Sequence, residues 1–409
     1  MNVTRRELIA AAAQAAVAAS VPLRRAGAQA PVIRFGVLND LSGPYKDIGG
    51  PLSAAATRLA ISDFGAAAKG MTVEILTADH QNKPDVGAGI ARQWFDRDGV
   101  DVILDVPNSG VALAVAGVAK EKNKVFLPSN PGTSDLTGKL CNANTIHWAY
   151  DTWMLAHATG SALVRNGGNA WYFITADYAF GHALQRDTSE FVTGAGGKVL
   201  GAARYPFPGT SDFSGFLLQA QSSGANVVAF ANAGADTINS IKQAKEFGLK
   251  QTLAGLLVFI SDVHSMGLET AQGLVISSSF YWDLNDRTRA FSQRLWAMAP
   301  NVRAGMGQAG CYSAALAYLK VAQAMGVAAA KQDGAATVAR MKAMPIDDDC
   351  FGTGTIREDG RKIHPAYLFQ VKKPAESRQP WDYYTLRATI PADEAFRPLK
   401  DGGCPLVKS

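Results

Sequence analysis

Small polar residues gather in three short segments of the sequence, and their side chains could bind an anion. The segments are Asn108-Ser109-Gly110, Ser129–Asp135 and Asn232–Asp236. Each lies between an apolar run and a stretch with helical spacing, so we expect each at the carboxyl end of a strand. Hydroxyls and the free N–H groups of a helix start suit a carboxylate without requiring a full counter-charge. Helix capping by Ser109 or Asp236 is the alternative that this pattern leaves open.

Residue patterns typical of catalysis are missing from the sequence. It contains no Gly-x-Ser-x-Gly nucleophile elbow, no Gly-x-x-x-x-Gly-Lys-Ser/Thr loop, and no Gly-x-Gly-x-x-Gly after the first apolar run. The 6 histidines are scattered, and no cysteine or histidine pair has the spacing of a metal site. We therefore expect a binding protein rather than an enzyme, with no cofactor and no metal.

Alternating extended and helical patterns indicate two α/β units that would position these segments. In the first unit, extended runs are expected at 32–38, 71–77, 100–105 and 124–127, and helices at 51–66, 85–97 and 111–120. In the second unit, strands are expected at 170–175, 198–205, 226–231 and 252–258, and helices at 152–165, 181–193, 211–221 and 236–247. This order predicts parallel sheets with right-handed crossovers. Helices at 286–298, 306–325 and 335–344 then suggest that the chain returns to the first unit.

The first thirty residues have the pattern of an export signal. The segment Thr4–Ile9 (TRRELI) precedes an alanine-rich apolar run, and small residues follow it as Ala28-Gln29-Ala30. This pattern is typical of a signal peptide, and the paired arginines favour the twin-arginine route. We expect cleavage after Ala28, with Ala30 as the alternative, and a periplasmic location.

Bulk composition fits an exported protein of two domains. Removing residues 1–28 takes away four arginines and one glutamate, so the formal net charge falls from +5 to +2. A nearly neutral chain without a cluster of basic and aromatic residues is not built to bind nucleic acid. No apolar run reaches the roughly 20 residues that span a bilayer. We expect a soluble, monomeric mature protein.

Four cysteines, an even number in an exported chain, suggest disulfides. They are Cys141, Cys311, Cys350 and Cys404. Four cysteines allow three pairings, which the sequence does not distinguish. We favour Cys141 with Cys404 and Cys311 with Cys350, and free buried thiols remain the alternative.

Four segments together resemble a known family. They are Ile33–Gly50 (IRFGVLNDLSGPYKDIGG), Leu104–Ala112 (LDVPNSGVA), Pro128–Gly138 (PSNPGTSDLTG) and Asp177–Gly181 (DYAFG). In order and spacing they are similar to the periplasmic solute-binding proteins of branched-chain-amino-acid-type ABC transporters. The resemblance implies a type I periplasmic binding fold, in which two Rossmann-like lobes with parallel sheets are joined by three hinge crossovers. It also implies an ABC permease in the inner membrane as partner.

Applied to this chain, the resemblance implies a division into two lobes. Residues 1–28 would be the signal peptide. The N-terminal lobe would comprise 31–148 plus 285–345, the C-terminal lobe 149–284 plus 346–390, and the tail 391–409. The ligand would be caught in the cleft between the lobes, which close by a hinge motion.

The resemblance also implies which residues hold the ligand. Ser109 and Thr133, with Asn130 close by, match the positions that bind the ligand carboxylate in the family. Phe180 stands where amino-acid binders carry a tyrosine, and Asp262 or Asp236 would be the partner of a ligand ammonium group. The complete set of expected ligand residues is Tyr45, Ser109, Asn130, Thr133, Trp148, Tyr150, Phe180, Phe230, Asn232, Asp236, Phe259 and Asp262.

The ligand itself has more than one interpretation. The segments SDLTGKLCNANTIHWAYD and TADYAFGHALQRD look closer to family members that take up aromatic carboxylates or other small organic acids. Such a ligand presents a carboxylate to the polar loops and a ring to the aromatic residues, and it needs no ammonium partner. The alternatives are a branched-chain amino acid or amide on the same scaffold, and a sensor module that presents its ligand to a receptor.

Overall fold

The computed structural model describes residues 32–408, so the expected signal peptide and its cleavage site lie outside the described residues. The first lobe is built on a four-stranded parallel sheet of order β2-β1-β3-β4. Its strands are β1 (Val32–Asn39), β2 (Thr72–Asp79), β3 (Val102–Asp105) and β4 (Val125–Pro128). The helices between them are α2 (Gly50–Phe64), α3 (Pro84–Asp96) and α4 (Ser109–Glu121).

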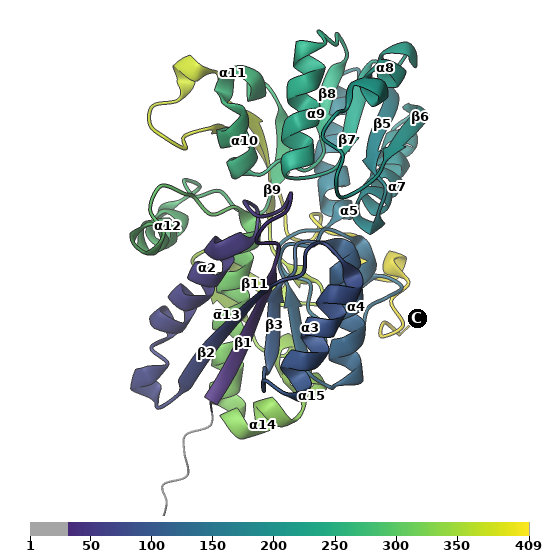
Figure 1. Ribbon diagram of the computed structural model, residues 1–409. Helices are drawn as coiled ribbons and strands as arrows, with labels where there is room; N and C mark the ends of the chain where they lie inside the picture. The colour runs from purple at the N-terminus through teal and green to yellow at the C-terminus, as the bar shows by residue number, and fades with distance from the viewer. Residues whose placement is uncertain (1–31, 409) are drawn as a thin grey trace, which may run out of the picture. The chain divides into compact units, whose positions relative to one another are not determined.

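Both faces of this sheet are covered by helices (Figure 1). Leu38 of β1 belongs to the apolar cluster of α3 and α4, whereas Phe35 and Val37 belong to the cluster that contains α2 and α13 (Met306–Met325). Because successive side chains of a strand point to opposite faces, a strand covered on both sides reads as a continuous apolar run. This explains why the sequence predicted these strands well.

The second lobe repeats the design. Its parallel sheet has the order β6-β5-β7-β8. The strands are β5 (Ala170–Ala176), β6 (Lys198–Tyr205), β7 (Val227–Ala231) and β8 (Thr252–Gly255). Its helices are α5 (Thr152–Leu155), α6 (Ser161–Arg165), α7 (Ala179–Gly194), α8 (Ser214–Ser222), α9 (Ala235–Glu246), α10 (Ile260–Met266) and α11 (Leu268–Ala271). One π-helical segment, Ala156–Gly160, interrupts the predicted helix 152–165 between α5 and α6.

The last third of the chain crosses between the lobes. The remaining helices are α12 (Asp286–Met298), α14 (Val327–Gln332) and α15 (Gly334–Lys342). Two antiparallel sheets have the orders β10-β11-β12 and β14-β13-β9. Their strands are β9 (Val275–Ser278), β10 (Ile346–Asp348), β11 (Gly352–Ile356), β12 (Lys362–Ile363), β13 (Ala366–Val371) and β14 (Tyr384–Ile390). The chain therefore changes lobe three times: between β4 and β5, between β9 and α12, and between β12 and β13.

The segment from residue 346, which was expected to return to the second lobe, begins with contacts to the first lobe. Asp348 accepts a hydrogen bond from Ser313 Oγ of α13 at 2.6 Å, and its other oxygen accepts those of Cys350 and Phe351 N–H, both at 2.9 Å. These bonds close the turn between β10 and β11 against the first lobe. The chain reaches the second lobe only at β13, which pairs with β9.

The structure confirms one expected disulfide and corrects the other. Cys141 and Cys404 are bonded, which ties the C-terminal tail to the loop that follows β4. Cys311 and Cys350 are buried free thiols. Cys311 lies on α13 with its sulfur 3.0 Å from Ser129 Oγ of the first sheet's edge, whereas Cys350 belongs to the turn after β10. Among residues 32–408, no helix is long and apolar enough to cross a membrane.

Candidate functional site

The expected ligand residues lie mostly in loops at the carboxyl ends of the central strands, and two lobe-to-lobe contacts join these loops. Ala235 N–H at the start of α9 donates to Pro44 O, in the loop after β1, at 3.1 Å. Tyr45 of that loop shares a hydrogen bond with Tyr178, the residue before α7, through the two hydroxyls. Parallel strands place their carboxyl ends at one edge of each sheet, which is where open α/β sheets bind ligands.

The structure brings Ser109 and Thr133 together. Both are fully buried, and Ser109 Oγ accepts a hydrogen bond from Thr133 N–H at 3.2 Å. Ser109 is the first residue of α4, but it is not the cap. That role belongs to Asn108, whose Oδ1 accepts the hydrogen bond of Val111 N–H at 3.0 Å. Helix capping therefore does not account for the Ser109 hydroxyl.

Asn130 is turned into the first lobe rather than toward the second. Its Nδ2 donates to Asp105 Oδ1 at 2.5 Å and to Ile48 O at 3.1 Å. Its main-chain oxygen accepts the hydrogen bond of the Tyr150 hydroxyl. Both amide protons of Asn130 are therefore committed, and the residue supports the loop that carries Thr133.

Two groups of aromatic rings lie between the lobes. Phe180 at the start of α7 packs so closely on Gly132 that a Cβ there would be 2.5 Å from its Cε2 atom and 3.3 Å from Tyr150 Cε2. Tyr150 in turn meets Phe259 edge-on, with ring centroids 6.0 Å apart. Phe180 and Tyr150 thus contact the residue before Thr133, and Phe259 packs on Tyr150.

The second aromatic group is a stack built from both lobes. Phe207 lies between Tyr178 and Tyr45, with ring centroids 4.3 Å and 5.3 Å away and nearly parallel planes. Tyr45 belongs to the first lobe, whereas Tyr178 and Phe207 belong to the second. The stack and the hydroxyl pair of Tyr45 and Tyr178 form a direct interlobe contact beside Asp236.

Four expected residues have other partners within their own lobes. Trp148 is buried and donates its Nε1–H to Ser313 Oγ at 2.8 Å, which accounts for its polar group. Phe230 is buried within β7, opposite Ile174 of β5. Asn232 accepts a hydrogen bond from Thr237 Oγ1 at 2.8 Å and donates one to Ser240 Oγ at 3.2 Å. Asp262 accepts the hydrogen bond of Phe259 N–H at 2.9 Å.

The acids expected to hold an ammonium group are both buried. Asp236 Oδ2 accepts the hydrogen bond of the Tyr205 hydroxyl at 2.8 Å, and burial raises the pKa of Asp236 to about 6. Asp262 caps the start of α10. Burial raises the pKa of Asp262 to about 7, although the hydrogen bond that it accepts from Phe259 N–H lowers the pKa in part. Burial without a cation disfavours the charged form, so neither carboxylate is a ready-made anionic site.

This burial predicts how Asp262 affects stability at different pH values. In the unfolded chain Asp262 ionises near its ordinary pKa of 3.8, whereas the folded protein keeps the proton up to about pH 7. The stabilisation from this group is therefore complete below pH 4 and is lost as the pH rises to 7. Relative to Asp262→Asn, which keeps a capping oxygen and does not titrate, the wild type should lose about 2–4 kcal/mol of unfolding free energy between pH 4 and 7. Urea unfolding of both proteins at several pH values measures this difference, and a difference independent of pH would contradict it.

Sequence reasoning left four contributors out of the site. Tyr178 is part of the DYAFG segment, Tyr205 ends β6 and Phe207 follows that strand, so the strand-end rule could have found them. Asp105 ends β3 and stands four residues before Ser109. The sequence feature that could have identified Asp105 is an acidic residue at the end of the otherwise apolar run 102–105.

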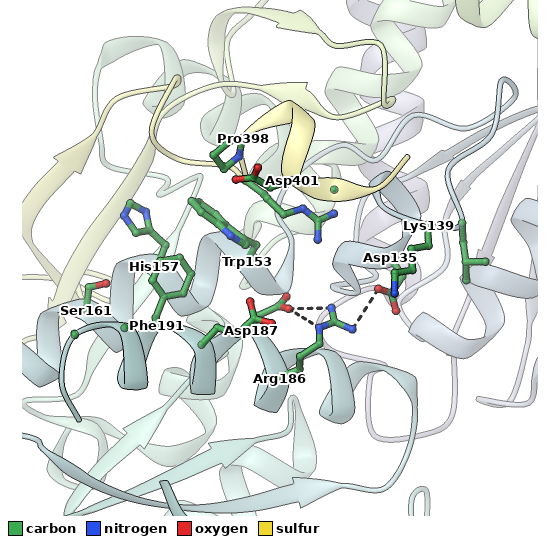
Figure 2. A pocket seen from close by; sticks show the side chains of 16 residues that line it. Asp135, Lys139, Trp153, His157, Ser161, Arg186, Asp187, Phe191, Pro398 and Asp401 are labelled. Carbon is green, nitrogen blue, oxygen red and sulfur yellow. Dashed lines mark hydrogen bonds and ion pairs between the residues drawn. The ribbon is translucent and has the colours of Figure 1, made fainter. Parts of the chain in front are cut away.

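A pocket of about 1040 Å³ lies elsewhere and contains none of the expected ligand residues (Figure 2). One wall carries Trp153, His157 and Phe191, and the other belongs to the 135–140 loop and the tail from Arg397 to Gly402. Figure 2 shows Arg186 between Asp135 and Asp187, at 3.3 Å and 2.9 Å. Arg186 is paired with these carboxylates, and the other charged residues of the lining, Lys139, Glu190, Arg397 and Asp401, are of both signs, so the pocket offers no clear preference for one charge.

Comparison with known proteins agrees with this architecture. Residues 32–377 match the family described as periplasmic binding protein. A solved periplasmic binding protein from Burkholderia mallei is 46% identical, with a TM-score of 0.89, and the match covers 93% of this chain and 100% of that one. A branched-chain amino acid ABC transporter periplasmic ligand-binding protein from Burkholderia xenovorans is 39% identical, with a TM-score of 0.80, and the match covers 91% and 99%.

More distant proteins share the fold. The Leu/Ile/Val-binding protein homolog 6 of Brucella melitensis is 25% identical over 79% of this chain and 83% of its own. A solute-binding protein of R. palustris, solved in complex with benzoate, is 21% identical with a TM-score of 0.80 over 92% of this chain and 100% of that one. Two lobes with parallel sheets, helices on both faces and a match over most of the sequence lead to one conclusion: the chain belongs to the periplasmic binding protein family and is a solute-binding protein of the ABC-transporter type.

Proposed function

We propose that this protein captures a small carboxylate between its lobes, with an aromatic acid as the favoured ligand, and delivers it to an inner-membrane ABC permease. The main support is the loop at Gly132 and Thr133. Thr133 is hydrogen-bonded to the buried Ser109 hydroxyl, while the adjacent Gly132 touches Phe180 and Tyr150. Polar hydrogen-bonding groups thus lie directly beside a wall of aromatic rings. A benzoate-like molecule has that same division into a polar end and a flat apolar ring.

The state of Asp236 and Asp262 argues against a ligand that must carry an ammonium group. Asp236 and Asp262 each use one carboxylate oxygen on a partner of their own lobe, Tyr205 and Phe259, and both carry raised pKa values. Phe180, in addition, has no hydroxyl to offer. An acid with no ammonium group leaves no positive charge unpaired in such a site, whereas an amino acid would require one of these carboxylates to ionise.

A branched-chain amino acid is the second candidate, and one observation favours it. Burial raises the pKa of the Tyr45 and Tyr178 phenols, and the negative charge of Asp236 lies close enough to raise both further. An ammonium group placed among these residues would have one carboxylate and two phenol oxygens as partners. The Burkholderia xenovorans and Brucella relatives carry names of branched-chain amino acid binders.

The mechanism that fits this arrangement is a population shift between open and closed lobes. The contacts Pro44–Ala235 and Tyr45–Tyr178 join loops of the two lobes, so they form only when the lobes are closed. A ligand that touches both lobes binds the closed form more tightly and favours closure by that difference in free energy. Delivery to the permease would then follow from recognition of the closed form.

A ligand screen tests the proposal. Thermal unfolding of the mature protein is measured with benzoate, 4-hydroxybenzoate, leucine, isoleucine, valine and succinate. A ligand at about 100 times its dissociation constant adds about 2.7 kcal/mol to the stability of the folded state. We expect the aromatic acids to raise the unfolding temperature and leucine to have little effect. Stabilisation by leucine alone would replace the favoured ligand with the second candidate, and stabilisation by no small carboxylate would contradict the proposal.

Ser109 provides a point test of the same site. Ser109→Ala should weaken binding of the ligand found in the screen by about 1–3 kcal/mol, because a buried charged group loses a hydrogen bond. Ser134→Ala is a suitable control, since Ser134 lies in the same loop but donates to Asp187 at 2.8 Å. Calorimetric titration of the three proteins gives the comparison. Equal affinity in wild type and Ser109→Ala would remove Ser109 from the site.

A further inference from the structure

Asp105 is a fully buried acid at the carboxyl end of β3, an inner strand of the first lobe's sheet. Its backbone has a φ of 76°, and that of Val106 is 58°. Left-handed backbone is unfavourable for residues with a side chain, most of all for a β-branched valine. Two such residues in succession persist only where the surrounding contacts hold them in place.

The carboxylate of Asp105 receives three hydrogen bonds from two neighbouring strand ends. Asn39 Nδ2, at the end of β1, donates to Oδ2 at 2.7 Å. Asn130 Nδ2, after β4, donates to Oδ1 at 2.5 Å, and Ser129 Oγ donates to the same oxygen at 3.4 Å. One acid therefore connects the loops that follow the outer two of three neighbouring strands.

Each amide uses its second N–H to hold the loop after β1. Asn39 donates its second N–H to Gly50 O at 3.0 Å and accepts the hydrogen bond of Gly50 N–H at 2.7 Å. Asn130 donates its second N–H to Ile48 O at 3.1 Å. The same loop carries Tyr45 and Pro44, which make the interlobe contacts. Both amides have all their N–H groups committed, so each requires an acceptor at Asp105.

We propose that Asp105 is a positioning residue for ligand capture, which holds the 44–50 loop and the 129–135 loop in the one arrangement that lets both reach the second lobe. This inference rests on the proposed function. Only a carboxylate offers one acceptor oxygen to each amide. An asparagine at this position would turn an NH₂ group toward one of the two donors, and an alanine would leave both amides without a partner.

The proposal predicts a pH dependence, because a protonated Asp105 presents an O–H to one amide. Burial raises the pKa of Asp105 to about 6, although the hydrogen bonds from Asn130 and Asn39 lower it. The titratable groups that face it are the Cys311 thiol of α13 and the Tyr150 phenol, and burial raises the pKa of both, so they stay neutral between pH 5 and 8. The nearby His80, whose pKa burial lowers to about 4, faces Asp40 and Asp79 and is also neutral there. The arrangement in which the two oxygens of Asp105 accept three hydrogen bonds should therefore be complete above pH 6 and lost below it.

The test compares wild type with Asp105→Asn and with Asp348→Asn. Asp348 is a matched control, because it is a buried first-lobe acid with three hydrogen-bond donors of its own on the β10–β11 turn. The first readout needs no ligand. In ¹⁵N-labelled wild type and Asp348→Asn, the side-chain amide signals of Asn39 and Asn130 should shift together with one midpoint near pH 6, and in Asp105→Asn neither should shift. Hydrogen–deuterium exchange at pH 8 should rise by at least about 10-fold in 44–50 and 129–135 of Asp105→Asn alone.

The second readout is calorimetric titration with benzoate and with leucine at pH 5 and pH 8. Asp105→Asn should bind the active probe at least about 10-fold more weakly than Asp348→Asn at pH 8, and wild type should lose affinity at pH 5. Amide signals that do not titrate, or unchanged exchange in both loops, would overturn the proposal. So would equal affinity of the two variants. If no carboxylate of the thermal screen binds wild type, it is the proposed function that fails, and the amide and exchange data still decide whether Asp105 positions the loops.

Discussion

Replacing Gly234 by alanine should weaken ligand binding by at least about 100-fold, while the two lobes stay folded. Gly234 precedes α9, and an added Cβ would lie 2.4 Å from Pro44 O and 3.1 Å from Tyr45 Cδ1, both in the opposite lobe. A contact that short with a main-chain atom cannot be relieved by a rotamer change, so the loops can separate only if the lobes open. A penalty of about 2.7 kcal/mol on the closed form corresponds to the predicted factor in affinity.

The matched control for this variant is Gly267→Ala. Gly234 and Gly267 both precede a second-lobe helix and both have positive φ, 59° and 77°, with ψ values of −132° and 151°. Alanine is strained at either position, so both variants should lose some thermal stability. No atom lies within 4 Å of a Cβ at Gly267, so that variant should bind its ligand like wild type. Calorimetry on both separates the clash between lobes from the backbone strain. Equal losses of affinity would show that closure does not require the Pro44–Ala235 contact.

Removing the disulfide should produce the largest change in stability. The Cys141–Cys404 bond joins residues 263 apart in the sequence. A cross-link that closes so long a loop restricts the unfolded chain strongly, and the loss of such a bond typically costs about 2–5 kcal/mol. We therefore expect Cys141→Ser/Cys404→Ser to unfold at a clearly lower urea concentration than wild type.

Reduction provides the control for the disulfide variant. Dithiothreitol should bring wild type to the midpoint of the double variant and should leave that variant unchanged, because its two other cysteines are free thiols. A shift of the double variant on reduction, or identical midpoints without reductant, would contradict the assignment. The loss should also loosen the tail near Arg397, which donates to Ser134 O at 3.1 Å in the loop beside Thr133.

Long elements with a clear period were predicted closely from the sequence. The helices expected at 286–298 and 306–325 are α12 and α13 with the same bounds. For α12, the start is fixed locally by Asn285, which accepts the hydrogen bond of Thr288 N–H at 3.0 Å. Two very short strands, β10 and β12, were missed. β10 and β12 have three and two residues, too few to show an alternation, and their positions depend on contacts with α13 and the first crossover.

The candidate site was predicted less completely, for a different physical reason. The sequence placed Ser109 and Thr133 at neighbouring strand ends, and topology alone brings such residues together. Whether a polar side chain then faces the ligand depends on partners far away in the sequence. Asn130 is committed to Asp105, 25 residues earlier, and Trp148 to Ser313, 165 residues later. No local pattern contains that information.

The two unbonded thiols, Cys311 and Cys350, can report how often the regions around them open to solvent. Burial raises the pKa of Cys311 and of Cys350 well above the ordinary value, so a native molecule presents almost no thiolate to an alkylating reagent. Cys311 lies next to Ser129 at the carboxyl ends of the first sheet's strands, and Cys350 lies in the turn of the β10–β11 hairpin. The rate at which each thiol is alkylated under native conditions therefore reports how often its own region is exposed to solvent, without any added label.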